Sequence, residues 1–341
     1  MKNFVLLCVV LIVCLGVGEG ALRVTGFQPR EVRINPFFVP GTETTWSVPD
    51  AELGWINKEG TSVAIEGDHV PMTFWSFGRR ATRAPSDATL PTELAGDHIP
   101  VMIVGGSNLQ SYGVRDEESF PYLLSQRFPA LSFENFGTGG YSTVQALMLM
   151  DRAYQKFYTE QKPRLILLAF DDAHILRNVA DQSWVFAISD PEGRYVAPPH
   201  YRMKNGAFNF RPFRTIGYWP LERRSALVTA LHNVWLKSIV YNTADEALAV
   251  TRKVVEQMAA YAKENGVLFA AVTLDDRGQS AAKVFEGMDF PYKDCSGLER
   301  TNPAEYMLKE GSHPNPKLHA HLAECIGDWL DSEILPKLQA Q

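Results

Sequence analysis

Short apolar runs alternate with helix-forming segments from about residue 98 onward. The runs at 101–105, 165–170 and 267–274 are apolar at almost every position, which is typical of parallel strands that are buried on both faces. A further short strand is expected at 132–136. The pattern therefore predicts a buried and largely parallel sheet.

Segments with helical periodicity follow these runs. Apolar residues recur at helical spacing in 117–127, in a segment that Ser142 can cap, and in 246–264. A last helix is expected from Pro316. The alternation of strands and helices predicts an α/β fold whose sheet is covered on both faces, and ligands of such sheets bind beyond the carboxyl ends of the strands.

Other parts of the chain depart from this alternation. Residues 1–20 combine a basic second residue with an apolar stretch and a small-residue segment, which indicates export through a cleaved signal peptide or a retained signal anchor. Residues 21–97 are predicted to form a lead-in rich in Pro and Gly, partly β. The main domain is expected at 98–341, with an aromatic insertion at about 180–240.

The composition is that of a globular protein and excludes some classes of function. The chain has 341 residues, of which 45% are hydrophobic and 21% are charged, so it can bury a large core. Its net charge is −6 and its isoelectric point is near 5.8. Because no basic stripe is interleaved with aromatic residues, nucleic acid is not expected as a partner.

Two of the four cysteines lie in the N-terminal apolar stretch, which leaves Cys295 and Cys325 for the exported domain. Export permits a disulfide. A pair of free thiols is an equally good interpretation, because one sequence does not decide the pairing. Both interpretations stay open at this point.

Residues of chemical interest come directly after predicted strands. Ser107 follows one strand through two glycines, and a hydroxyl on such a turn is where many α/β proteins present a nucleophile. Gly140 and Asp171 follow two other strands. His313 lies just before the last helix, from where a general base could reach Ser107.

Four short blocks that contain these residues resemble, in the same order, the blocks of the SGNH (GDSL-type) hydrolase and acyl-esterase family. They are 105–108, 135–142, 169–172 and 310–313. The resemblance covers roughly residues 98–335, and a looser one to exported, membrane-proximal members lies in the lead-in. It implies a three-layer, flavodoxin-like sandwich with a central parallel sheet, preceded by an irregular lead-in that contains β-structure.

The resemblance also implies catalytic roles. Ser107 takes the position of the nucleophile, His313 that of the base, and Glu310 that of the carboxylate that orients the base. The backbone N–H groups of Ser107 and Gly140, with Asp171, take the positions of the oxyanion hole.

Departures from the family's pattern affect three positions. Gly106 stands where the family has an aspartate, Asp171 where it has an asparagine, and Glu310 where it has an aspartate. An ionised carboxylate cannot donate a hydrogen bond to an oxyanion. Three alternatives follow: Asp171 is protonated, another donor such as Asn178 or Asn108 replaces it, or the oxyanion hole is weak.

Polar residues beside these blocks are candidates for contact with substrate: Asn108, Asp172, His174 and Asn178. The alternative for them is a structural role at a strand end or the start of a helix. No metal is expected, because His319 and His321 are two residues apart and point to different faces of a helix. No cofactor is expected either, since the glycines at 137–140 fail the dinucleotide spacing and no phosphate-binding loop occurs.

The function expected from the resemblance is hydrolysis of an ester by a serine nucleophile through an acyl-enzyme. The substrate would be an O-acyl group, such as O-acetyl, on a carbohydrate or similar polar molecule, reached outside the cytoplasm in a periplasmic, extracellular or membrane-anchored form. Two alternatives stay open: an O-acyltransferase of surface polysaccharide, and a non-catalytic glycan-binding protein. The acyl group, the acceptor and the oligomeric state do not follow from the sequence.

Overall fold

The computed structural model describes residues 2–31, 46–64, 68–84, 98–190, 192–204, 206–240, 243–309 and 313–340. Glu310, the expected partner of His313, lies outside these residues. The described part forms an α/β fold around an eight-stranded sheet in the order β14-β13-β8-β6-β7-β5-β4-β3.

Parallel strands make up most of the sheet. They are β6 (Ile99–Gly105), β7 (Leu131–Gly137), β8 (Leu165–Asp171), β13 (Leu268–Asp275) and β14 (Tyr292–Asp294). Their spatial order is that of the flavodoxin-like sheet, in which the first strand lies between the second and the third. The spatial order of successive strands reverses between β6 and β8, so a crevice is expected beyond the carboxyl end of β6.

Strands of the lead-in extend this sheet next to β7. They are β3 (Gly60–Val63), β4 (Pro71–Trp75) and β5 (Arg79–Arg80), and all three pair antiparallel. Strands β1 (Ser47–Asp50) and β2 (Gly54–Asn57) form a separate hairpin. The lead-in is therefore joined to the main sheet by backbone hydrogen bonds.

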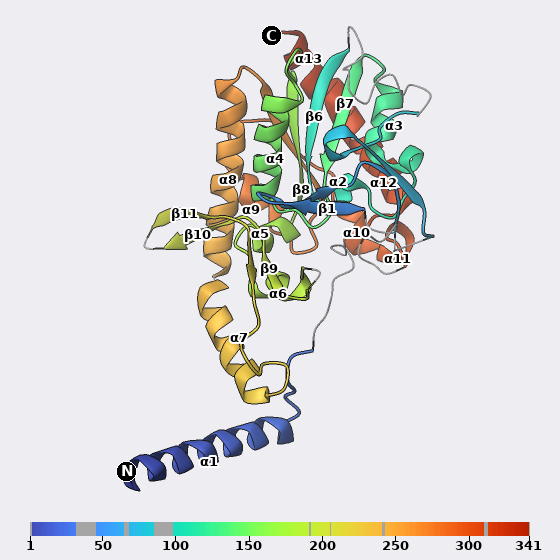
Figure 1. Cartoon of the computed structure of the whole chain (residues 1–341). Helices are drawn as coiled ribbons and strands as arrows, with labels where there is room; N and C mark the ends of the chain where they lie inside the picture. Colours follow the sequence, from blue (N-terminus) through green and yellow to red (C-terminus); the bar gives the residue numbers. More distant parts are fainter. Residues whose placement is uncertain are drawn as a thin grey trace.

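Helices cover both faces of the sheet (Figure 1). One face packs against α4 (Thr143–Lys156) and α8 (Ala244–Glu264), and the other packs against α3 (Phe120–Arg127) and α12 (Pro316–Trp329). Successive residues of β6 alternate between the two layers, as the pleat requires. Both layers are apolar, which explains why the sequence shows nearly continuous apolar runs.

Short helices fill the connections and the C-terminal end. They are α2 (Ser107–Gln110), α5 (Ala173–Arg177), α9 (Ala281–Phe285), α10 (Leu298–Thr301), α11 (Pro303–Tyr306) and α13 (Leu335–Gln339), with 3-10 turns at Ser76–Gly78 and Asp116–Glu118 and a π-helical turn at Leu330–Ile334. The pairing of Cys295 with Cys325, open from the sequence, is a disulfide that links the loop after β14 to α12.

The insertion is more regular than its sequence suggests. It contains α6 (Gln182–Ala187), the strands β9 (Tyr195–Ala197), β10 (His200–Lys204), β11 (Ala207–Arg211) and β12 (Arg214–Ile216), and the apolar helix α7 (Ala226–Val240). Helix α7 is hidden from a periodicity analysis because it is apolar on most sides. Part of its surface is exposed at Leu231, Val234 and Trp235.

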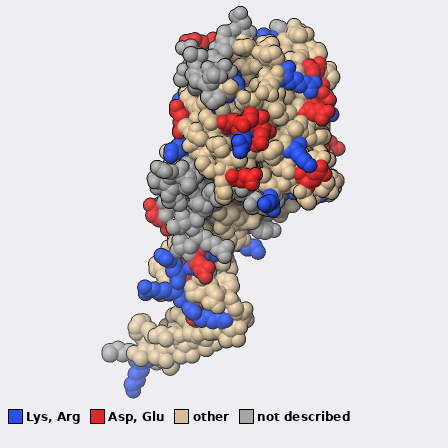
Figure 2. All heavy atoms as spheres, turned by 90° about the vertical axis from the view of Figure 1, so that its right-hand side faces the viewer, with Lys and Arg blue, Asp and Glu red and all other residues tan. Residues whose placement is uncertain are grey.

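Helix α1 (Lys2–Val24) projects from the body and meets α7 (Figure 1). None of its residues is buried, and it is the one helix in the described part that is long and apolar enough to cross a membrane. Figure 2 shows it as a largely uncharged projection, with Lys and Arg side chains close to where it joins the body. Such a helix is compatible with a signal sequence or an anchor.

Candidate functional site

Ser107 is the first residue of α2 and follows β6 through two glycines. A Cβ on Gly105 would lie 2.4 Å from the carbonyl oxygen of Ala169, so only glycine permits this approach of β6 to β8. The N–H of Ser107 lies in the first turn of its helix, where no backbone acceptor within the helix is available. The turn therefore presents both a hydroxyl and a backbone donor.

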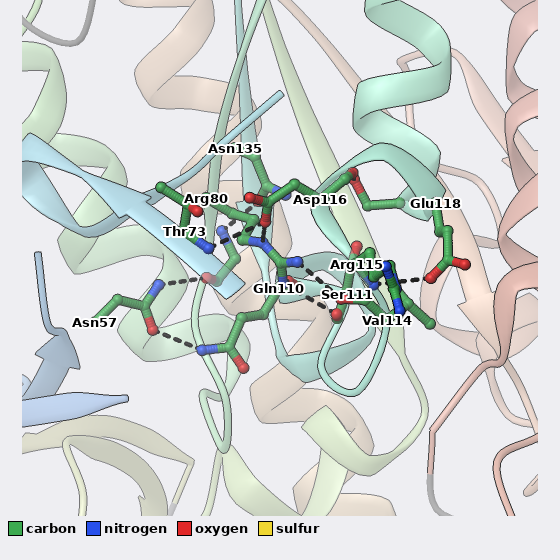
Figure 3. Close-up of polar contacts among 12 residues, drawn as sticks. Asn57, Thr73, Arg80, Gln110, Ser111, Val114, Arg115, Asp116, Glu118 and Asn135 are labelled. Carbon is green, nitrogen blue, oxygen red and sulfur yellow. Dashed lines mark hydrogen bonds and ion pairs between the residues drawn. The ribbon is translucent and has the colours of Figure 1, made fainter. Parts of the chain in front are cut away.

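The loop after Ser107 is held by the buried guanidinium of Arg80 from β5 (Figure 3). Arg80 donates to the carbonyl oxygens of Gln110 at 2.9 Å, Ser111 at 3.1 Å and Val114 at 2.9 Å, and to Oδ1 of Asp116 at 2.7 Å. These bonds use the fixed fork of the guanidinium, which a lysine cannot reproduce. The lead-in thus fixes the segment that follows the candidate nucleophile.

Gly140 lies in a turn after β7, where Tyr141 N–H donates to the carbonyl oxygen of Thr138. Its φ is +75°, a conformation that favours glycine, and a Cβ would lie 3.2 Å from atoms of both Trp55 and Trp184. Trp55 Nε1 donates to the Gly139 carbonyl oxygen at 2.8 Å. Because C=O and N–H of one trans peptide point in opposite directions, this bond directs the Gly140 N–H away from Trp55.

His313 lies in the loop that leads into α12. Its carbonyl oxygen accepts from Leu308 N–H at 2.9 Å, and Asn315 caps the helix by accepting from the N–H groups of Lys317 and Leu318. The His313 ring lies against Tyr112, with 5.1 Å between ring centroids. The cap and the ring contact restrict the position of the imidazole.

Ser107, Gly140 and His313 line one small cavity at the carboxyl ends of the strands, with a volume of about 200 Å³. The nucleophile, oxyanion glycine and base expected from the sequence therefore come together from three distant parts of the chain. The other residues that line the cavity are Trp46, Trp55, Gln110, Tyr112, Gly139, Arg177, Trp184 and Ile188.

Asp171, Asn108 and His174 form a buried cluster behind the Ser107 turn and do not line this cavity. Asn108 Nδ2 donates to Asp171 Oδ1 at 2.9 Å, and Asp171 Oδ2 lies 3.6 Å from His174 Nε2. A Cβ on Gly106 would lie 2.7 Å from His174 Nε2. His174 therefore occupies the space that a side chain at position 106 would need.

Burial sets the protonation of this cluster. Burial, together with the negative charge of Asp275, raises the pKa of Asp171 to about 8, so its carboxyl group is mostly protonated at neutral pH. Burial lowers the pKa of His174 to about 3, so its imidazole is neutral. A protonated Asp171 can donate a hydrogen bond, in contrast to an ionised one.

Asp172 and Asn178 lie away from the cavity lining. Asp172 Oδ2 accepts from Gly278 N–H and so ties the end of β8 to the loop after β13. Asn178 is fully buried and accepts from Val144 N–H at 3.0 Å and donates to Thr251 Oγ1 at 3.0 Å. Its bonds join α4 and α8 beneath the insertion.

Sequence reasoning did not assign Trp46, Gln110, Tyr112 or Arg177 to the site. Gln110 and Tyr112 follow Ser107 closely, and their proximity to the expected nucleophile was an available signal. Trp46 comes from the lead-in, and only the packing of that segment over the Gly139 turn brings it to the cavity. No local pattern in the sequence indicates that contact.

No protein-family model matches the chain, and no curated protein matches it in sequence. Among solved structures, an esterase of Pseudoalteromonas sp. is 12% identical, with a TM-score of 0.36, covering 68% of this chain and 99% of its own. A GDSL-like lipase from Bacteroides thetaiotaomicron is 12% identical, with a TM-score of 0.36, covering 73% and 95% of the two chains. AlinE4, an SGNH-family esterase, is 13% identical, with a TM-score of 0.34, covering 72% and 98%. Solved structures of SGNH/GDSL-type esterases and lipases are thus what this chain is similar to, at 12–13% identity and TM-scores of 0.34–0.36.

Proposed function

We propose that the protein is a serine ester hydrolase with Ser107 as nucleophile and His313 as general base. The observation that carries this proposal is that Ser107, His313 and Gly140 line the same small cavity. These are the group that attacks, the group that takes its proton, and a glycine whose N–H can face a developing oxyanion.

The reaction runs in two steps. His313 accepts the Ser107 proton as Oγ attacks the ester carbonyl, and it then gives that proton to the departing alcohol, which leaves an acyl-Ser107 ester. In the second step His313 deprotonates a water that attacks the acyl carbon, and the carboxylic acid leaves as Ser107 regains its proton. Glu310 is proposed to orient His313 in both steps.

Oxyanion stabilisation is assigned to the N–H groups of Ser107 and Gly140. The Trp55 bond to the Gly139 carbonyl oxygen keeps the second donor oriented, so Trp55 is a positioning residue. One preorganised donor of this type contributes about 3 kcal/mol to transition-state stabilisation. Asp171, protonated at neutral pH and bonded to Asn108, is proposed to support the turn that carries the first donor.

The substrate class is proposed to be an O-acyl ester on a carbohydrate or a similar polar molecule. The small cavity favours a short acyl group, and its tryptophan and tyrosine side chains suit the apolar face of a ring. Transfer of the acyl group to another hydroxyl would use the same acyl-enzyme, with that hydroxyl in place of water.

We also propose that α1 is retained as a membrane anchor and that the rest of the chain faces outside the cytoplasm. Glu19 of α1 accepts hydrogen bonds from Ser225 Oγ at 2.7 Å, Ala226 N–H at 3.0 Å and Leu227 N–H at 2.9 Å, and so caps the start of α7. Removal of residues 1–20 would leave these N–H groups without the cap.

Hydrolysis of p-nitrophenyl acetate by the full chain tests the proposed activity. Ser107→Ala is expected to lower kcat/KM by about a thousandfold or more, and His313→Ala by about a hundredfold or more, because each removes an essential partner of the acyl transfer. Ser125→Ala is the matched control, since among the described residues its hydroxyl bonds only to the Pro121 carbonyl oxygen within α3.

Circular dichroism of each variant confirms that it folds. Equal kcat/KM for wild type and a folded Ser107→Ala variant would overturn the assignment of the nucleophile. An inactive wild type that still binds glycan would favour the non-catalytic alternative.

A further inference from the structure

Arg177 lies at the end of α5 and lines the same cavity as Ser107 and His313. Its guanidinium carbon lies 4.3 Å from the ring centroid of Trp184, and its Nη1 donates to the Tyr141 carbonyl oxygen at 3.2 Å. Stacking on an indole and one backbone bond fix the plane of the guanidinium. They leave most of its five N–H donors available for another acceptor.

The charge of Arg177 has no close counterion in the described part of the chain. Asp171, Asp172 and Asp275 act on it through space, but none is bonded to it. Asp171 is also mostly protonated at neutral pH, which weakens its contribution. Arg177 is partly buried, and a partly desolvated charge without a paired carboxylate gains free energy when an anion joins it.

A second donor lies beside the guanidinium. Trp184 Nε1 is buried and has no hydrogen-bond partner among the described residues. The Trp184 ring faces Gly140: its Cζ2 atom lies 3.2 Å from the position that a Cβ on Gly140 would take. Arg177 and the Trp184 ring that supports it therefore both line the cavity next to the proposed oxyanion glycine.

We propose that this cavity selects esters that carry a carboxylate on the same small unit as the scissile acyl group, with the Arg177 guanidinium as the binding group and the Trp184 ring as its support. This inference rests on the proposed function and names its substrate class. A carboxylate has only acceptors, and its planar shape matches the donors of the guanidinium fork. Because the cavity is small, the carboxylate and the ester belong to one small molecule or one unit of a polymer.

Two esters of nearly the same shape test the selection: 4-acetoxybenzoate, which is anionic, and 4-acetoxybenzamide, which is neutral. For wild type, kcat/KM is expected to be about tenfold or more higher for the anion, as one charge-assisted hydrogen bond would give. Arg177→Gln is expected to remove that ratio, and Arg177→Lys to restore part of it. Arg127→Gln is the control, because it removes a surface charge that pairs with Asp328 and Asp331.

Binding of the products gives a readout that does not depend on catalysis. By calorimetry, wild type is expected to bind 4-hydroxybenzoate about tenfold more tightly than 4-hydroxybenzamide, and Arg177→Gln to bind the two equally. A wild-type ratio near one in both assays, or a ratio that Arg177→Gln leaves unchanged, would overturn the proposal. Preference in binding without hydrolysis that depends on Ser107 would overturn only the proposed esterase activity.

Discussion

At the scale of single residues, the Gly-Gly-Ser turn and the cluster behind it explain each other. A side chain at position 106, where the resembled family has an aspartate, would collide with His174, which lies beside Gly106. Asp171, at the expected asparagine position, is buried against Asn108 and mostly protonated. Gly106, His174 and Asp171 therefore form one connected arrangement behind the Ser107 turn.

A stability measurement on Asp171→Asn tests this arrangement. In the unfolded chain Asp171 ionises above about pH 4, whereas burial holds the folded pKa near 8. Wild type therefore loses stability, relative to the variant, as pH rises from about 4 to 8. At pH 4 the free energy of unfolding of Asp171→Asn should equal or fall below that of wild type. Between pH 4 and pH 8 the free energy of unfolding of the variant should rise, relative to that of wild type, by a few kcal/mol, to order of magnitude.

Urea denaturation at several pH values measures this difference, and Asp151→Asn, an exposed carboxylate on α4, is the control. A difference in unfolding free energy between Asp171→Asn and wild type that stays constant from pH 4 to 8 would show that Asp171 is ionised in the folded protein.

At the scale of elements, segments outside the parallel sheet position the turns that carry Ser107 and Gly140. Arg80 of β5 holds the loop after α2, and Trp55 of β2 holds the Gly139–Gly140 peptide. The sequence predicts the parallel strands and their helices well, because continuous apolar runs and helical periodicity are local signals. It does not predict the antiparallel extension of the sheet, since these strands are short and their pairing is decided by contacts far along the chain.

Local sequence signals also reveal one part of the site and not the rest. Ser107, Gly140 and His313 are recognised from blocks of neighbouring residues. Arg177 and Trp184 enter the cavity through the packing of α5 and α6, and α7 has no amphipathic pattern to reveal it.

The contact between α1 and α7 makes a prediction about processing. Because Glu19 caps three groups at the start of α7, the mature protein is expected to keep residues 1–20 and to stay with the membrane fraction after alkaline carbonate washing. Intact mass and N-terminal sequencing of the purified protein measure this directly. A mature N-terminus near residue 20, with the protein in the soluble fraction, would instead identify a cleaved signal peptide.

At the scale of the whole molecule, the cavity is assembled from the lead-in, three strand ends and the loop before α12. The disulfide between Cys295 and Cys325 fixes α12 to the edge of the sheet. His313 lies in the loop that leads into this helix. A sheet of this order provides a crevice at β6, and the additions around it close that crevice to a small volume. In this crevice we propose Ser107 as the nucleophile and His313 as the base that activates it.

Covalent labelling by a fluorophosphonate, followed by mass spectrometry, tests these two roles, because the reagent phosphonylates serines that an adjacent base activates. We expect one adduct per chain, located by peptide mapping at Ser107, with labelling at least about a hundredfold slower in His313→Ala. An adduct that persists in Ser107→Ala, or a folded wild type that takes up no label, would show that Ser107 is not an activated nucleophile.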